Sequence, residues 1–177
     1  DLAWINSPSN PTGRVHSESE LQAALDWSQK TGAVLASDEC YLSFPDSKQG
    51  SSVLALTEGR NTNVLAVHSL SKRSNLAGYR GSFIAGDSLL ISRLLEIRKH
   101  MGMMVPLPIQ KAVATALSDE LHVQEQAERY KNRRKVLRRE LEAQGFTIEY
   151  SEAGLYIWCT RGEEDWSTVQ WFAERGI

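Results

Sequence analysis

Three short apolar runs, at residues 2–6, 33–37 and 64–67, limit the folds that are open to this chain. Each run is too short for a helix and gives way abruptly to polar residues, which predicts buried strands. Between the first two runs lies an amphipathic stretch that indicates a helix, with Ser17 and Glu20 as a capping box at its start. A strand, a helix and a strand at this spacing form a βαβ unit, so the sequence predicts a parallel sheet.

The stretch after the third run carries an unusual combination of side chains. Ser69 and Ser71 flank an apolar residue, Lys72 follows, and Arg80 comes eight residues later. Ligand sites in open α/β sheets lie at the carboxyl ends of strands, where this stretch is expected. A lysine amine can form a Schiff base with an aldehyde, and hydroxyls with a guanidinium can hold a phosphate. Aldehyde and phosphate together describe pyridoxal phosphate, whereas the alternative is a surface loop with solvated cations.

The other two strand ends also carry polar side chains, each with two open interpretations. Residues 7–13 are turn formers that include two prolines, so this rigid loop either presents Asn10 in a fixed pose or is a plain connecting turn. Asp38 directly follows the second strand, as a solvated loop acid or as a carboxylate placed to pair with a protonated ring nitrogen. Tyr41, three residues later, can donate a hydrogen bond to a nearby oxygen.

Composition argues against several classes of protein. The chain has 177 residues, of which 41% are hydrophobic and 24% charged, so it can bury a sizeable core. Its net charge of -2 gives no general attraction to nucleic acid or to an anionic membrane. It has neither an apolar run of membrane-spanning length nor a visible signal peptide. Because Cys40 and Cys159 lie far apart without metal-ligand spacing, we expect a reduced, cytoplasmic protein without a metal.

The second half of the chain has a different pattern. We expect a strand at 82–86, a helix at 89–100 capped by Ser88, and helices at 109–117 and 120–144. Two alternating runs then predict an antiparallel pair joined by a turn at residues 151–154. This change of pattern predicts two domains with a boundary near residue 119.

Two surfaces of these helices also carry expectations. The apolar residues of helix 89–100 and the methionines that follow it, at 101–104, are expected to face the core, although the methionines also suit a pocket or a subunit contact. Helix 120–144 carries many basic residues. Glutamates bracket them and no aromatic platform accompanies them, so we expect a solvated face, not a nucleic-acid reader.

Three motifs stand at the predicted strand ends in order: Asn-Pro-Thr-Gly at 10–13, Asp-Glu-Cys-Tyr at 38–41, and Ser-Leu-Ser-Lys at 69–72 with Arg80. Together they resemble the class I/II pyridoxal-phosphate aminotransferases of fold type I, over essentially the whole chain. The resemblance implies an α/β fold, in which part of a large, mostly parallel-sheet domain is followed by part of a smaller α+β domain.

The resemblance implies these domain bounds and a role for each matched residue. Residues 1–118 would belong to the large cofactor-binding domain, and residues 119–177 to the small domain, which begins with a long interdomain helix. Lys72 would bind the cofactor and later move a proton, while Asp38 would pair with the pyridine nitrogen. Two residues would hydrogen-bond the phenolic oxygen of the ring: Asn10 and Tyr41. Three would serve the phosphate: Ser69, Ser71 and Arg80.

The sequence around the motifs, at residues 6–15, 37–41, 68–80 and 98–106, resembles that of the actinobacterial-type N-succinyldiaminopimelate aminotransferases of lysine biosynthesis. Such enzymes exchange an amino group between glutamate and N-succinyl-2-amino-6-oxopimelate. The family implies small-molecule donor and acceptor substrates, a homodimer, and further segments before and after this chain. We therefore expect a central-to-C-terminal fragment that is inactive alone.

Three alternatives remain open at this point. One is a pyridoxal-phosphate lyase on the same fold, in which Lys72 and Asp38 would serve equally well. Another is the non-catalytic cofactor-sensing domain of a transcriptional regulator. The third is a structural remnant with a vestigial site, which the intact set of matched cofactor contacts disfavours.

Overall fold

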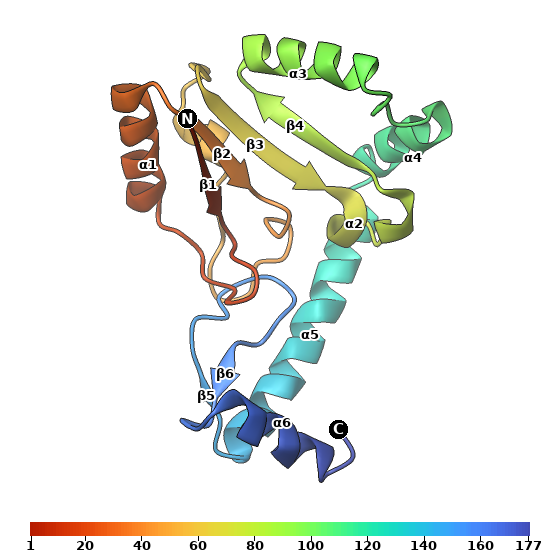
Figure 1. Cartoon of the computed structure of the whole chain (residues 1–177). Helices are drawn as coiled ribbons and strands as arrows, with labels where there is room; N and C mark the ends of the chain where they lie inside the picture. Colours follow the sequence, from red (N-terminus) through yellow and green to blue (C-terminus); the bar gives the residue numbers. More distant parts are fainter.

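The computed structural model describes residues 1–177, and Figure 1 shows a sheet from which a long helix runs toward the C-terminal elements. The sheet has the order β1 (Leu2–Asn6), β2 (Val34–Asp38), β3 (Val64–Ser69) and β4 (Ser82–Gly86). The first three strands are parallel, and β4 is antiparallel to β3. The predicted α/β fold with a mostly parallel sheet is confirmed.

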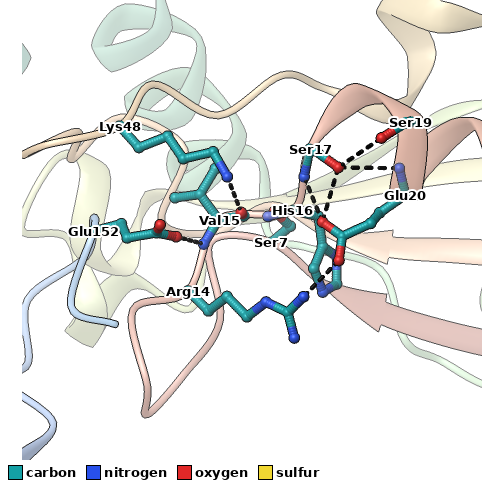
Figure 2. A network of polar contacts seen from close by, with 9 residues as sticks. All are labelled: Ser7, Arg14, Val15, His16, Ser17, Ser19, Glu20, Lys48 and Glu152. Atoms are coloured by element: carbon teal, nitrogen blue, oxygen red, sulfur yellow. Dashed lines mark hydrogen bonds and ion pairs between the residues drawn. The ribbon is translucent and has the colours of Figure 1, made fainter. Parts of the chain in front are cut away.

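Helix α1 (Glu18–Thr31) connects β1 to β2 and begins as the sequence predicts. The Ser17 hydroxyl accepts a hydrogen bond from the Glu20 amide, and the Glu20 carboxylate accepts one from the Ser17 amide at 2.7 Å, as Figure 2 shows. Gly32 ends the helix with a φ of 72°, a left-handed conformation that glycine adopts without strain. Both ends of α1 are therefore set by local sequence.

The core lies between α1, the short 3-10 helix η1 (Val53–Leu56) and the sheet. Its fully buried residues are Leu25, Leu35, Val53, Val64 and Ala66. Burial of a large aliphatic side chain contributes about 1.5–3 kcal/mol. This packing holds β1, β2 and β3 in fixed register, and it thereby fixes where their carboxyl ends lie.

Helix α3 (Ser88–His100) does not begin with the predicted cap. Asp87 is the N-cap, because its Oδ1 accepts hydrogen bonds from the amides of Leu89 at 2.8 Å and Leu90 at 3.1 Å. Its Oδ2 also accepts one from the Asn63 amide at 2.7 Å, just before β3. This tertiary contact favours the aspartate over the adjacent serine.

The apolar residues of α3 and of α4 (Leu107–Leu117) are not in the core. Neither helix has a buried residue, and Met101 is 66% exposed. The core packing predicted for helix 89–100 and for the methionines is therefore wrong for this chain. The physical reason is that no other element of the chain covers this face.

The C-terminal third contains α5 (Leu121–Ala143), β5 (Thr147–Ile148), β6 (Cys159–Thr160) and α6 (Asp165–Ala173). Strands β5 and β6 are antiparallel, as predicted, but shorter than expected. Length and polarity rule out a membrane crossing by any helix of the structure. Helix α5 begins close to residue 119, and the division into two domains stays a prediction.

The hairpin turn that the sequence predicts at residues 151–154 does not form, and these residues belong to a longer segment, residues 151–156, which we call the return segment. They lie between β5 and β6 and run back to the loop after β1 (Figure 1). The Ser151 amide donates to the Thr12 carbonyl at 2.9 Å, and the amides of Glu152 and Ala153 donate to the Gly13 carbonyl at 3.0 Å. Their backbone groups are paired with the N-terminal half instead of with each other.

One basic residue of α5 is not solvated as predicted. The side chain of Arg134 is only 4% exposed and forms an ion pair of 3.1 Å with Asp46. The others on this helix remain exposed or half-exposed: Arg129, Lys131, Arg133, Lys135, Arg138 and Arg139. A buried guanidinium needs several acceptors, and Arg134 finds them in segments far away in sequence.

Candidate active site

The carboxyl ends of the three parallel strands meet at one edge of the sheet. Asn6 at the end of β1 is in register with Asp38 at the end of β2, and Asp38 is in register with Val67 of β3. A pocket of about 490 Å³ opens there, within the usual range for small-molecule sites. Six of the seven residues that the sequence singles out line it: Asn10, Asp38, Tyr41, Ser69, Ser71 and Lys72.

Lys72 lies on a single helical turn, α2 (Leu70–Arg73), that follows β3 directly. The Ser69 hydroxyl caps this turn by accepting a hydrogen bond from the Ser71 amide at 3.1 Å. The Leu70 side chain is fully buried, and its amide donates to the Gly81 carbonyl at 3.1 Å. The turn is thus held by the buried Leu70, and Lys72 lies at the end of β3.

Asp38 and the Asn10 loop are joined by Asn6, a pocket residue that sequence reasoning missed. Asn6 donates from Nδ2 to the Asp38 carbonyl at 3.0 Å and accepts at Oδ1 from the Asn10 amide at 2.7 Å. The Asp38 carboxylate itself accepts a hydrogen bond from the Cys40 amide at 3.0 Å. An amide side chain at the last position of an apolar strand was the signal that could have revealed Asn6.

Asn10 and Tyr41 meet in the pocket, since Nδ2 of Asn10 donates to the Tyr41 hydroxyl at 3.4 Å. Burial raises the pKa of Tyr41, and hydrogen bonding with the neighbouring Tyr156 raises it further. A phenol is already protonated near neutral pH, and this shift extends the pH range over which Tyr41 stays so.

Cys40 also lines the pocket, although the sequence did not single it out. Burial, and to a lesser extent a hydrogen bond with Asp38, raises the pKa of its thiol to about 12. A thiol with such a pKa is a poor nucleophile and a poor metal ligand, because both roles need the thiolate. This cysteine is therefore poorly suited to act as the nucleophile of the pocket.

Arg80 is the one predicted residue that the structure does not bring to the pocket. It follows the short 3-10 helix η2 (Ala77–Tyr79) with a φ of 54°, and its exposed guanidinium donates to the Ala77 carbonyl at 2.8 Å. Its phosphate-binding role stays a prediction.

A family model described as "Aminotransferase class I and II" matches residues 2–175 of this chain. The chain belongs to the class I and II aminotransferase family. It is 51% identical to 4-dedimethylamino-4-oxo-anhydrotetracycline transaminase OxyQ of Streptomyces rimosus, over 99% of this chain and 50% of that protein. It is 48% identical to the probable aminotransferase Rv1178 of Mycobacterium tuberculosis, over 99% of this chain and 43% of that protein.

Solved structures give the same result for the fold of this family member. An aminotransferase from Neisseria meningitidis superposes with a TM-score of 0.81 at 32% identity, over 89% of this chain and 41% of that one. The chain spans about half the length of the curated relatives described above.

Class I and II aminotransferases depend on pyridoxal 5'-phosphate, and the donor set of the pocket suits this cofactor. The pocket combines an amine for an aldehyde, a carboxylate for a ring nitrogen, and an amide–phenol pair for a phenolic oxygen. Serine hydroxyls at the end of β3 complete the set with groups that can bind phosphate oxygens.

Proposed function

We propose that this chain forms the cofactor-binding part of a pyridoxal-phosphate-dependent aminotransferase, which moves an amino group from an amino acid to a keto or aldehyde acceptor. The observation that carries the proposal is the convergence of Lys72, Asp38 and the Asn10–Tyr41 pair on one pocket. When bound there, the cofactor would supply an aldehyde for amine exchange and an electron-withdrawing ring.

Lys72 has the central role in this proposal. Its amine would hold the cofactor through the aldehyde carbon, with loss of water. When the amine of a substrate takes its place at that carbon, the released Lys72 amine would be available as a general base. It would accept the proton from Cα of the substrate and return it at the neighbouring carbon. A well-placed acid–base group typically contributes about 10²–10⁴-fold in rate.

The other pocket residues would orient the cofactor and polarise its ring. The Asp38 carboxylate, which the Cys40 amide holds in place, would accept a hydrogen bond from the protonated ring nitrogen and keep it charged. Asn10 and Tyr41 would donate to the phenolic oxygen. Ser69 and Ser71 would bind the phosphate, and Arg80 would join them after its guanidinium leaves the Ala77 carbonyl.

We further propose glutamate as the amino donor and N-succinyl-2-amino-6-oxopimelate as the acceptor, on the basis of the sequence resemblance around the motifs. The transaminase OxyQ, at 51% identity, is named for a tetracycline intermediate, so a polycyclic ketone is the competing acceptor. The same resemblance supports a homodimeric, cytoplasmic enzyme.

The decisive experiment is to map the cofactor on the full-length protein. We would add pyridoxal 5'-phosphate, reduce with borohydride and identify the modified peptide by mass spectrometry. The expected adduct is on Lys72 and disappears in Lys72→Ala. It persists in Lys99→Ala, a control on the exposed face of α3. Adducts scattered over surface lysines, or none, would contradict the proposal.

An amino-donor and keto-acid screen would then test the reaction, beginning with glutamate. Amine transfer is the expected outcome, with a matching loss in Lys72→Ala. Elimination products in place of amine transfer would identify a lyase instead.

A further inference from the structure

We propose that Tyr156 is a positioning residue of this pocket, that it holds the Tyr41 phenol against Asn10, and that Arg134 in turn holds Tyr156. The inference rests on the proposed function, because its importance lies in how the cofactor is bound. It adds the return segment, from the C-terminal third, to a pocket that is otherwise built from the first 72 residues.

The contact between the two tyrosines carries the inference. Their ring centroids are 6.1 Å apart with an interplanar angle of 60°, so the rings meet edge to face. Tyr41 is only 7% exposed, whereas Tyr156 is 42% exposed and forms the outer member of the pair. Edge-to-face aromatic pairs restrict ring orientation, and Tyr156 therefore limits where the hydroxyl of Tyr41 can point.

The contacts of the Tyr41 hydroxyl also restrict the orientation of this side chain. It accepts the hydrogen bond of 3.4 Å from Asn10, and it also interacts with the phenol of Tyr156, which contributes to its raised pKa. A phenol held between an amide and a second phenol has few alternative orientations. This geometry favours one position for the donor that would meet the phenolic oxygen of the cofactor.

Arg134 explains why Tyr156 lies there. Its guanidinium donates to the carbonyl of Tyr156 and, at 2.6 Å, to the carbonyl of Ser151. It therefore clamps both ends of the return segment to α5. The ion pair with Asp46 extends the clamp to the loop that follows Tyr41. Because the guanidinium is almost fully buried, the removal of any of these acceptors would be costly.

The return segment is also fastened to the Asn10 loop. Its hydrogen bonds to Thr12 and Gly13 lie two and three residues beyond Asn10. Figure 2 shows Glu152 of this segment accepting a hydrogen bond from the Val15 amide, at 2.7 Å. The Gly154 amide donates to the Phe44 carbonyl at 2.8 Å. Asn10 and Tyr41, which the sequence places on separate loops, are thus both braced by one C-terminal segment.

The test uses full-length protein loaded with pyridoxal 5'-phosphate and measures the pH at which the visible absorbance of the bound cofactor changes. Donors to the phenolic oxygen favour its ionised form and lower this pH. Tyr41→Phe should therefore raise it by about 0.3–1 pH unit, the scale of one neutral hydrogen bond. Tyr156→Phe should shift it in the same direction by less, and Tyr156→Ala by more than Tyr156→Phe.

Two further variants separate positioning from simple packing. Tyr156→Phe combined with Tyr41→Phe should give no shift beyond that of Tyr41→Phe alone, because Tyr156 acts through Tyr41. Arg134→Lys, which keeps the charge but loses the planar fork, should shift the pH in the same direction as Tyr156→Phe. Tyr150→Phe is the matched control, since Tyr150 is exposed and precedes the return segment, and it should cause no shift.

The outcomes are distinguishable. An unchanged pH in Tyr156→Phe and Tyr156→Ala, even with a lower melting temperature, would overturn the positioning role. If Tyr156→Phe caused the same pH shift in wild type and in the Tyr41→Phe background, Tyr156 would act independently of Tyr41, and the positioning role would also be overturned. A wild-type protein that binds no cofactor would overturn both this inference and the proposed function.

Discussion

Oε2 of Glu39 lies 3.3 Å from Nε2 of His68, and the Glu39 side chain is almost completely buried. Oε1 of the same carboxylate accepts a hydrogen bond from the Val53 amide at 2.8 Å. Glu39 follows Asp38 and His68 precedes Ser69, yet neither lines the pocket. The pair therefore joins the ends of β2 and β3 at the level where both pocket residues emerge.

His68→Phe tests this relationship. The variant preserves stacking on Phe83, whose ring centroid is 4.9 Å from that of His68, but removes the imidazole nitrogen that lies beside Oε2 of Glu39, a buried oxygen that accepts no hydrogen bond. We expect a loss of about 1–3 kcal/mol in the free energy of unfolding, measured by urea denaturation. His100→Phe, on the exposed end of α3, should change it by less than about 0.5 kcal/mol. Equal losses in the two variants would argue against a role for the pair.

Gly13→Ala should be more harmful than an ordinary glycine substitution. Gly13 has a φ of 68°, and a Cβ there would lie 2.6 Å from the Ala153 carbonyl oxygen, in the return segment. We expect a loss of about 2 kcal/mol or more, together with weaker cofactor binding. Gly32→Ala is the control, because φ is 72° but nothing lies within 4 Å, and about 1 kcal/mol is expected there. If both variants lost the same stability, close packing at Gly13 would be unimportant.

Asp87 should make stability depend on pH in acid. Hydrogen bonds from the Asn63 amide, and then from the Leu90 amide, lower the pKa of Asp87 below its ordinary value of 3.8. The stabilisation is therefore fully present above that value, and it is lost as pH falls through the lower pKa of the folded state. Asp87→Asn keeps a capping side chain without the charge. The difference in free energy of unfolding between this variant and wild type should therefore disappear in acid. Asp87→Ala should lose about 1 kcal/mol at pH 7 through the missing cap. A gap for Asp87→Asn that is constant with pH in a urea titration would contradict this assignment.

Cys40 should be slow to alkylate. Its pKa of about 12 is roughly three units above that of an ordinary thiol, which lowers the thiolate fraction about 1000-fold at pH 8. The rate of iodoacetamide labelling, followed at Cys40 by mass spectrometry, should rise about tenfold per pH unit from pH 7 to 9.5. Bound cofactor should slow it further, because Cys40 lines the pocket. In urea the same cysteine should react as an ordinary thiol, and a plateau below pH 9 in the folded protein would contradict the raised pKa.

Asp38→Ala should separate cofactor attachment from catalysis. The adduct at Lys72 should still form, because the carboxylate is not the attachment point. Removal of the substrate Cα proton should slow by about 100-fold or more, since the ring nitrogen would no longer be held protonated. Single-turnover measurements with glutamate would show this, with Asp26→Ala on the outer face of α1 as the control. Unchanged rates would remove Asp38 from this role.

Much of the fold follows from local sequence. The capping box at Ser17, the left-handed Gly32 and the short apolar runs each depend on neighbours within a few residues, and the structure has them where they are predicted. The convergence of Asn10, Asp38 and Lys72 also followed, because parallel strands place their carboxyl ends on one edge. By contrast, the cap at Asp87 depends on the amide of Asn63, which is not adjacent in sequence.

The βαβ unit and the set of polar side chains at the strand ends can be predicted from the sequence, because periodicity, caps and motif spacing are local properties. Three features become visible only in the folded chain: Arg134 is buried, residues 151–156 run back to the Asn10 loop, and Tyr156 contacts Tyr41. These features depend on which distant carbonyls and rings come within reach. An arginine in a basic helix has the same local pattern whether it is solvated or clamped, and packing alone distinguishes the two.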